Sequence, residues 1–178
     1  MGGLACGLAL LLTTACTSSS TLPTSGPFGS TIPNSGMICA HTRPGGTAYS
    51  GFEGFPNRDG KAIIDKVVLA HARHLRLVAA WVLPISNSRE GVGVGGGYPT
   101  ASSVASDAPG TRWDLRQPIR GAVVRHTHGQ ESINLVIVAK PSGKVGTSTA
   151  VDLYYEAAGT RYLLHFPYGF TVRVGRTC

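Results

Sequence analysis

Two histidines with strand spacing are the first candidates for chemistry in this sequence. His126 and His128 are two residues apart, so both imidazoles would lie on one face of a β-strand. Together they could ligate Zn or Cu if a third donor, such as His41 or His165, came from elsewhere in the fold. No carboxylate-rich cluster accompanies them in the sequence. The alternative is a pair of exposed polar residues beside a turn at residues 128–130.

Three glycines, Gly91, Gly93 and Gly96, form the pattern G-x-G-x-x-G, with Asp114 downstream. In a dinucleotide-binding site this pattern follows a first strand and opens a helix, whose N-terminus holds the pyrophosphate. Here a Tyr-Pro pair follows the glycines, and no βαβ unit is visible. The pattern therefore predicts a loop or a glycine-rich strand edge, and we expect no cofactor.

Hydrolase chemistry finds little support in the sequence. No serine lies in a G-x-S-x-G elbow, and no H-E-x-x-H motif is present. Asp152 and Glu156 are four apart in a strand-like segment, so parity alone places both carboxylates on one side, where they could face a glycan. The simpler interpretation is solvent-facing charge opposite Leu153 and Tyr155. We expect no enzymatic activity.

Basic residues give the chain a net charge of +7, and all charged residues lie at or beyond Arg43. Four arginines fall within one short stretch that also contains a tryptophan: Arg112, Arg116, Arg120 and Arg125. Such a surface could contact anionic lipid head groups or wall polymers. The alternative is scattered arginine on an ordinary solvated face. Because aromatic residues do not interleave the arginines on a recognised nucleic-acid-binding fold, we expect no nucleic-acid partner.

The uncharged N-terminus has the pattern of an export signal. Residues 4–12 are apolar over the length of a signal-peptide core, and small residues lead to Cys16. The sequence LLLTTAC followed by TSSS resembles a bacterial lipoprotein signal, in which the cysteine is lipidated and becomes the mature N-terminus. The resemblance implies lipidation of Cys16 and attachment to the extracytoplasmic face of the membrane. The alternatives are secretion after cleavage near Ala15 and a buried N-terminal helix.

The chain then divides into three parts. Residues 1–15 are the signal peptide, 16–37 form a flexible tether rich in Ser, Thr, Gly and Pro, and 38–178 are the folded domain. Of the four cysteines, Cys6 would leave with the signal and Cys16 would carry lipid. The remaining pair, Cys39 and Cys178, would form a disulfide in an oxidising compartment.

Period-two alternation in the domain predicts β-strands. Residues 133–140 form a β-branched run, 151–166 form two strands around a turn at Ala158-Gly159, and 170–175 form a last strand. Residues 62–85 are ambiguous, because their apolar positions also fit a helix, but β-branched content favours two strands with a turn at the His-Ala-Arg-His centre. Trp81 and Trp113 are expected to be packing residues. We predict an all-β fold, a single antiparallel, immunoglobulin-like β-sandwich.

The domain also resembles a known group of proteins. The succession HLRLVAAWVLPI, GVGVGGGYP, RWDLRQPIRGAVV, NLVIVAK and YYEAAGTRYLLHF is similar to small exported β-sandwich domains of Gram-positive actinobacteria, often attached to lipoprotein signals. The resemblance implies location and fold and brings no catalytic residues. The sequence thus predicts a lipid-anchored envelope protein with a non-enzymatic binding or structural domain, whose partner is an anionic envelope component or a protein. The alternative is an extracytoplasmic metal-binding protein or an unrecognised hydrolase that uses the histidines.

Overall fold

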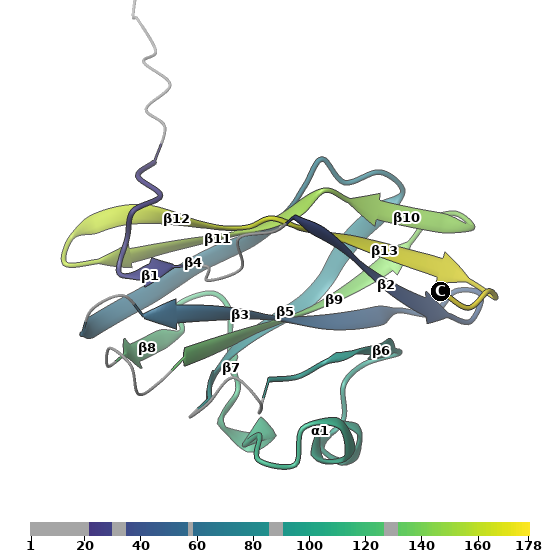
Figure 1. Ribbon diagram of the computed structural model, residues 1–178, viewed down its shortest axis with the longest axis horizontal. Coiled ribbons are helices and arrows are strands. Elements are labelled where there is room, and N and C mark those ends of the chain that lie inside the picture. Colours follow the sequence, from purple (N-terminus) through teal and green to yellow (C-terminus); the bar gives the residue numbers. More distant parts are fainter. Residues whose placement is uncertain (1–21, 30–34, 57–58, 86–90, 127–131) are drawn as a thin grey trace, which may run out of the picture.

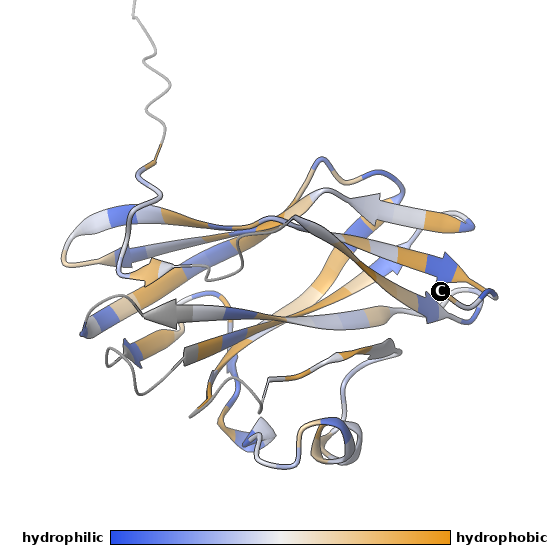
Figure 2. Ribbon diagram, in the orientation of Figure 1, coloured by the Kyte–Doolittle hydropathy of each residue, from blue (hydrophilic) through white to orange (hydrophobic). Residues whose placement is uncertain are grey.

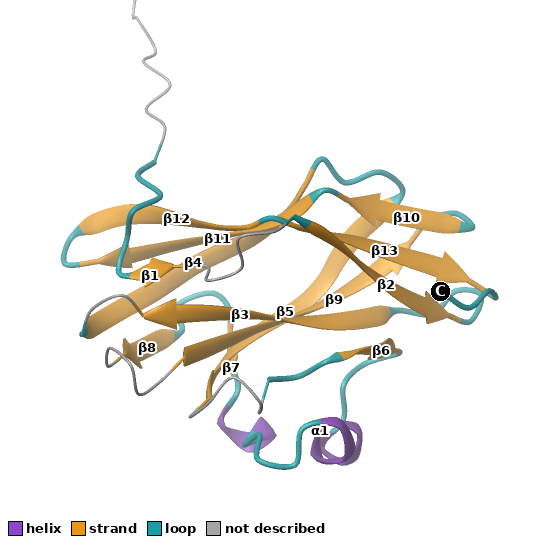
Figure 3. Ribbon diagram, viewed as in Figure 1, coloured by secondary structure: helices purple, strands orange, loops and turns teal. Residues whose placement is uncertain are grey.

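The computed structural model describes residues 22–29, 35–56, 59–85, 91–126 and 132–178. The fold is a β-sandwich, as predicted, with strands in two facing layers and short helices along one side (Figures 1 and 3). One layer is a sheet in the order β1 (Phe28–Gly29), β3 (Ala48–Pro56), β9 (Ser132–Pro141), β5 (Leu75–Ile85) and β7 (Gln117–Pro118), with β6 (Val94–Gly96) paired to β3.

Two smaller sheets make the other layer. The four-stranded sheet has the order β12 (Thr160–Phe166), β11 (Ala150–Ala157), β4 (Gly60–Ala70) and β8 (Val123–His126). The three-stranded sheet has the order β10 (Val145–Ser148), β13 (Tyr168–Val174) and β2 (Gly36–Thr42). The layers enclose a core in which Leu135, Leu153 and Phe166 are fully buried. Hydrophobic residues lie in bands along the strands, as burial of one face requires (Figure 2).

A second apolar cluster covers the other face of the large sheet. The segment after β6 contains α1 (Ala101–Asp107) and a short 3-10 helix, η1 (Trp113–Leu115). Val104 of α1 is fully buried, and Trp113 packs edge to face on Trp81 with 5.7 Å between ring centroids. The tryptophans are packing residues, as predicted. The sequence pattern did not predict α1, whose first turn is held by a capping box between Thr100 and Ser103.

The ambiguous segment 62–85 forms two strands, as β-branched content indicated. β4 and β5 belong to different layers, and the chain crosses between them at residues 71–74. His71 and His74 adopt positive φ values of 47° and 51°, which a turn requires and a continuous helix would not allow. The apolar residues of this segment are spaced by four and three, which also fits a helix. Burial of one face of each strand in the sandwich nevertheless makes the segment form two strands.

The sandwich is closed covalently near the C-terminus. Cys39 of β2 and Cys178 form a disulfide with 5.8 Å between their Cα atoms, as predicted. One strand pair departs from the antiparallel prediction, because β2 and β13 run parallel. They come from opposite ends of the domain, so their relative direction is set by the fold and no hairpin dictates it.

The predicted tether overlaps the folded domain, and the boundary at residue 38 is wrong. Phe28 is 0% exposed and packs edge to face on Tyr155, with ring centroids 5.1 Å apart. Upstream, the carbonyl of Pro23 accepts a hydrogen bond from the N–H of Leu163 in β12, at 3.1 Å. A single large apolar side chain thus anchors a segment whose overall composition predicts disorder. Residues 16–21 of that tether, with Cys16, and residues 30–34 lie outside the described residues.

Within the described residues, no helix has the length and apolar character that crossing a membrane would need.

Candidate functional site

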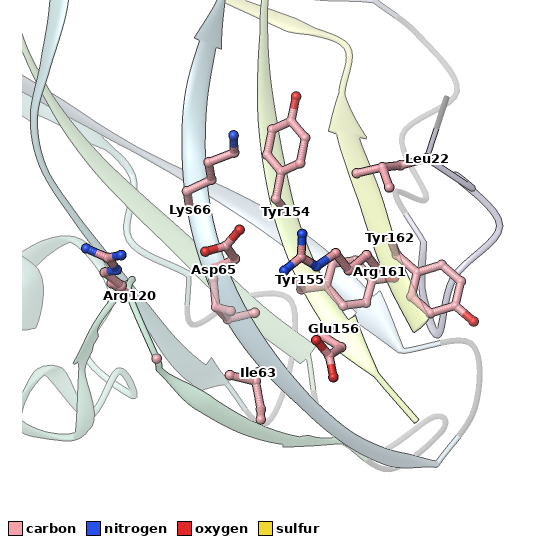
Figure 4. Close-up of a pocket in the computed structure, with 12 residues that line it drawn as sticks. Leu22, Ile63, Asp65, Lys66, Arg120, Tyr154, Tyr155, Glu156, Arg161 and Tyr162 are labelled. Carbon is pink, nitrogen blue, oxygen red and sulfur yellow. The ribbon is translucent and has the colours of Figure 1, made fainter. Parts of the chain in front are cut away.

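A groove with a volume of about 400 Å³ lies on the outward side of the four-stranded sheet (Figure 4). Its walls come from β4, β11 and β12, from Arg120 and Gly121 before β8, and from Leu22 of the N-terminal segment. Five separate parts of the chain thus meet at one place. We call the outward surface of β12, β11, β4 and β8, together with Leu22 and Arg120, the groove face.

Strand alternation points the side chains of β11 to this groove. Leu153 and Tyr155 are buried in the core, so Tyr154 and Glu156 turn outward. Across the hairpin, Arg161 lies opposite Glu156. The register with β4 shifts between Tyr154 and Tyr155, because Lys66 pairs with Tyr154 and Ile64 with Tyr155. Asp65 is the extra residue of this bulge, and it also lines the groove.

Tyrosines form the aromatic part of the groove. The ammonium of Lys66 lies 4.5 Å from the ring centroid of Tyr154, within cation–π distance. Tyr162 stacks on Tyr155, with 5.5 Å between their centroids. Tyr155 in turn is buried and connects the groove to the core. The groove therefore offers aromatic rings beside charged groups, which suits recognition of an amphipathic or polar surface.

Charges of both signs surround these rings. Lys66, Arg120 and Arg161 are the basic residues of the lining, and Asp65 and Glu156 are the acidic ones, an excess of one positive charge. In the close-up these side chains are spread over several strands of an open surface (Figure 4). Among the described residues, no ion pair within 4.0 Å joins any of these five groups. All five residues are exposed, so an external partner of opposite charge can reach them, and Lys66 also contacts the ring of Tyr154.

Large apolar side chains are exposed on the groove face. Ile63 of β4 is 45% exposed and lies directly opposite Val123 of β8, which is 39% exposed. Val68, on the same side of β4, is 38% exposed. Exposed apolar side chains gathered beside charges are a feature of interaction surfaces.

The structure separates the four arginines that the sequence placed in one basic stretch. Arg112 makes two hydrogen bonds to Asp114, at 2.6 and 2.9 Å, and its guanidinium lowers the pKa of that carboxyl. Arg116 lies over the ring of Trp113, 4.8 Å from its centroid. Arg120 lines the groove, and Arg125 lies on β8 opposite Lys61. Of the four arginines, Arg120 and Arg125 therefore lie on the groove face, and Arg112 and Arg116 do not.

The histidine hypothesis stays a prediction. His128 lies outside the described residues, and His126 ends β8 with a side chain that is not described. Among the part of the chain that is described, no group of three His, Cys, Asp or Glu residues is placed to hold a metal ion. Of the two suggested third donors, His41 is exposed, and His165 forms a pair with Asp152 through Nδ1 and Oδ1, 2.6 Å apart.

This Asp152–His165 pair is the contact that most resembles catalytic machinery. Sequence reasoning missed it, although the hairpin around Ala158-Gly159 fixes the register that places the two residues opposite each other. A hydrolytic dyad also needs a nucleophile within reach of the free imidazole nitrogen. Within residues 22–29, 35–56, 59–85, 91–126 and 132–178, no Ser, Thr or Cys side chain hydrogen-bonds to His165.

The glycine pattern has a packing role. A Cβ on Gly91 would lie 2.3 Å from the Glu53 carboxylate, and one on Gly96 would lie 2.7 Å from the carbonyl of His41. The carbonyl of Gly93 accepts a hydrogen bond from the N–H of Gly51 in β3 at 3.0 Å. The pattern is a glycine-rich strand edge, as expected, that lets residues 91–96 pass close over β3.

Comparison with known proteins does not assign a function. No family model matches the chain, and no curated protein matches it. A solved structure described as "Structure of the N-terminal domain of PorA" is similar over 84% of this chain and 98% of that chain, with 13% identity and a TM-score of 0.34. The groove must therefore be interpreted from its own chemistry.

Proposed function

We propose that this chain is a lipid-anchored, extracytoplasmic protein of the cell envelope, of the actinobacterial type that its sequence resembles, and that its β-sandwich is a non-enzymatic binding module. The observation that carries the proposal is the groove face. Catalysis needs polar groups that converge in a water-excluding pocket, whereas this groove spreads tyrosines and charges over an open sheet. Exposed Ile63 and Val123 extend the contact area beside it.

Two features support the extracytoplasmic address. The Cys39–Cys178 disulfide suits an oxidising compartment, where such bonds persist. Upstream, Cys16 follows an apolar run and small residues, the pattern of a lipidated cysteine. Lipid at Cys16 would hold the protein on the membrane, since acyl chains contribute about 0.8 kcal/mol per buried CH2.

The anchor is tested by intact mass and membrane fractionation of the protein from an actinobacterial host. We expect a membrane-bound chain that begins at Cys16 and carries added lipid mass. Cys16→Ala should abolish both the lipid and the cleavage, while Cys6→Ala, in the part that leaves with the signal, should retain both. An uncleaved, unlipidated wild-type chain would overturn the anchor.

The binding surface is tested in the same cells by photo-crosslinking. A photoreactive phenylalanine analogue replaces Tyr154 on the groove face, and in a control chain it replaces Tyr98, which is exposed on the opposite side beside Trp81. We expect adducts of defined mass from position 154 in excess over position 98. Equal yields from the two positions would contradict binding through the groove face.

A further inference from the structure

We infer that the groove face lies against the bilayer that carries the anchor, with its basic side chains on anionic lipid head groups. The inference rests on the proposed lipidation of Cys16 and names the partner of the same surface. Three observations carry it: the point where the N-terminal segment joins the fold, the charges around that point, and the apolar side chains between those charges.

The length of the linkage restricts the position of the domain. Residues 17–21 are the five residues between Cys16 and Leu22. Fully extended, they allow about 20 Å between the Cα atoms of Cys16 and Leu22, at roughly 3.3–3.6 Å per residue. A free chain as far as Ile38 would allow about 75 Å by the same rule. The domain is therefore held close to the membrane.

The N-terminal segment joins the fold on the groove face. Leu22 lines the groove, and the neighbouring Pro23 is held to β12 through the N–H of Leu163. From there the described segment descends past β12 to β1, where Phe28 enters the core (Figure 1). Because the short linkage leaves at Leu22, the surface around Leu22 is the part of the domain nearest to the anchor.

The charges around Leu22 suit an anionic bilayer. The groove face, with Asp59 just before β4, carries five basic residues and four acidic ones, an excess of one positive charge: Lys61, Lys66, Arg120, Arg125, Arg161, and Asp59, Asp65, Asp152, Glu156. Asp152 is paired with His165 of β12, which leaves the basic side chains around the groove as the larger group of charges there. Lys61 and Arg125 lie directly opposite each other on β4 and β8, a like-charge arrangement that an anionic partner would relieve. Each basic side chain near an anionic membrane surface increases the affinity of a protein for that surface about fivefold.

The apolar side chains on this face match the interfacial region of a bilayer. Ile63 and Val123 are exposed neighbours between the basic residues, and the ring of Tyr154 lies beside the ammonium of Lys66. Tyrosine favours the boundary between water and lipid, because its ring is apolar and its hydroxyl polar. Lys and Arg can place their stems on apolar surface while their charges reach phosphate groups.

The experiment measures which side of the domain meets lipid. The purified lipoprotein is reconstituted in vesicles of phosphatidylglycerol and brominated phosphatidylcholine, because bromine quenches nearby tryptophan fluorescence. Tyr154→Trp places a reporter in the groove, and Tyr98→Trp places one on the opposite side, near the native Trp81 and Trp113 of the second apolar cluster. We expect strong quenching of Tyr154→Trp and none beyond the native background for Tyr98→Trp. Equal quenching of the two variants would overturn the inference.

A second pair of variants distinguishes electrostatic attraction between the groove face and the lipid from closeness that the short linkage alone imposes. In the Tyr154→Trp chain, a Gly-Ser insertion after Ser20 lengthens the linkage, so that only attraction holds the groove face down. Lys66→Gln, Arg120→Gln and Arg161→Gln together should then abolish the quenching. The matched control removes three exposed charges at the other end of the domain, Arg43→Gln, Lys144→Gln and Arg176→Gln, and should retain it. Loss of quenching in both sets, or in neither, would contradict a specific role for the groove cations.

The outcomes also separate this inference from the proposed function. A protein without lipid mass fails the anchor test, and the inference fails with it. A lipidated protein whose photo-crosslinks at position 154 are to a protein or a wall polymer remains a binding module but contradicts the bilayer as the partner. Crosslinks to phospholipid, together with quenching confined to position 154, support both.

Discussion

The hydroxyl of Tyr155 accepts a hydrogen bond from the backbone N–H of Phe28 at 3.2 Å, across 127 residues of sequence. The two rings also pack edge to face. Tyr155 lies on β11 behind the groove, and Phe28 is the first residue of β1, six residues after Leu22. This contact therefore makes the start of the domain and the base of the groove one structural unit, and it fixes where a membrane linkage would join the fold.

Tyr155→Phe should weaken the attachment of the N-terminal segment to β11. The change removes one acceptor from a buried N–H while keeping the ring, so we expect a loss of about 1 kcal/mol in the free energy of unfolding. Urea titration gives the stability, and hydrogen exchange should show faster exchange of the Phe28 amide. The control is Tyr154→Phe, whose hydroxyl faces outward, and its stability should match that of the wild type. An equal loss in both variants would show that the Phe28 contact is not the cause.

Gly51→Ala should destabilise the domain by about 1–3 kcal/mol, as overpacking does. A Cβ on Gly51 would lie 1.9 Å from the backbone carbonyl oxygen of Val92, which cannot move aside as a side chain could. Gly93→Ala is the control, because no atom lies within 4 Å of its added Cβ and its φ is not in the left-handed region. Thermal unfolding of the two variants compares them directly. Similar melting temperatures would contradict the close passage of residues 91–96 over β3.

Glu53→Gln should change how stability depends on pH. Burial raises the pKa of Glu53 above its ordinary 4.5, because the charged form is poorly solvated beside Val92 and Asn134. The favourable contribution of the protonated form is fully present below the unfolded pKa and is lost as pH rises through the folded pKa. Glutamine stays neutral, so the variant should gain stability relative to the wild type as pH rises from acid to neutral. Melting curves at several pH values test this, and a constant difference at all pH values would contradict it.

Reduction of the Cys39–Cys178 bond should cost up to about 5 kcal/mol, the chain-entropy value for closing a loop of its 139-residue separation. Urea titration with and without a reductant measures the loss. The double variant Cys39→Ser, Cys178→Ser should be equally weakened and insensitive to reductant. If reductant left the wild type unchanged, the bond would not contribute to the stability of the fold.

Local signals in the sequence predicted the strands well. Along β11, alternation placed Leu153 inside and Glu156 outside, because neighbouring side chains of a strand point to opposite faces. The disulfide between Cys39 and Cys178 followed from elimination among four cysteines. The Asp152–His165 pair was within reach of the same reasoning, because a two-residue hairpin turn sets the register of its strands.

The sequence by itself determined the all-β class, the hairpin register and the disulfide pair, since each depends on neighbours along the chain or on residue counts. Only the tertiary structure decided that Phe28 belongs to the core, that β2 runs parallel to β13, and that Leu22, Arg120 and Tyr154 border one groove. These relationships join segments far apart in sequence. Their formation depends on which surfaces the sheets bury together, and no local period or composition records that.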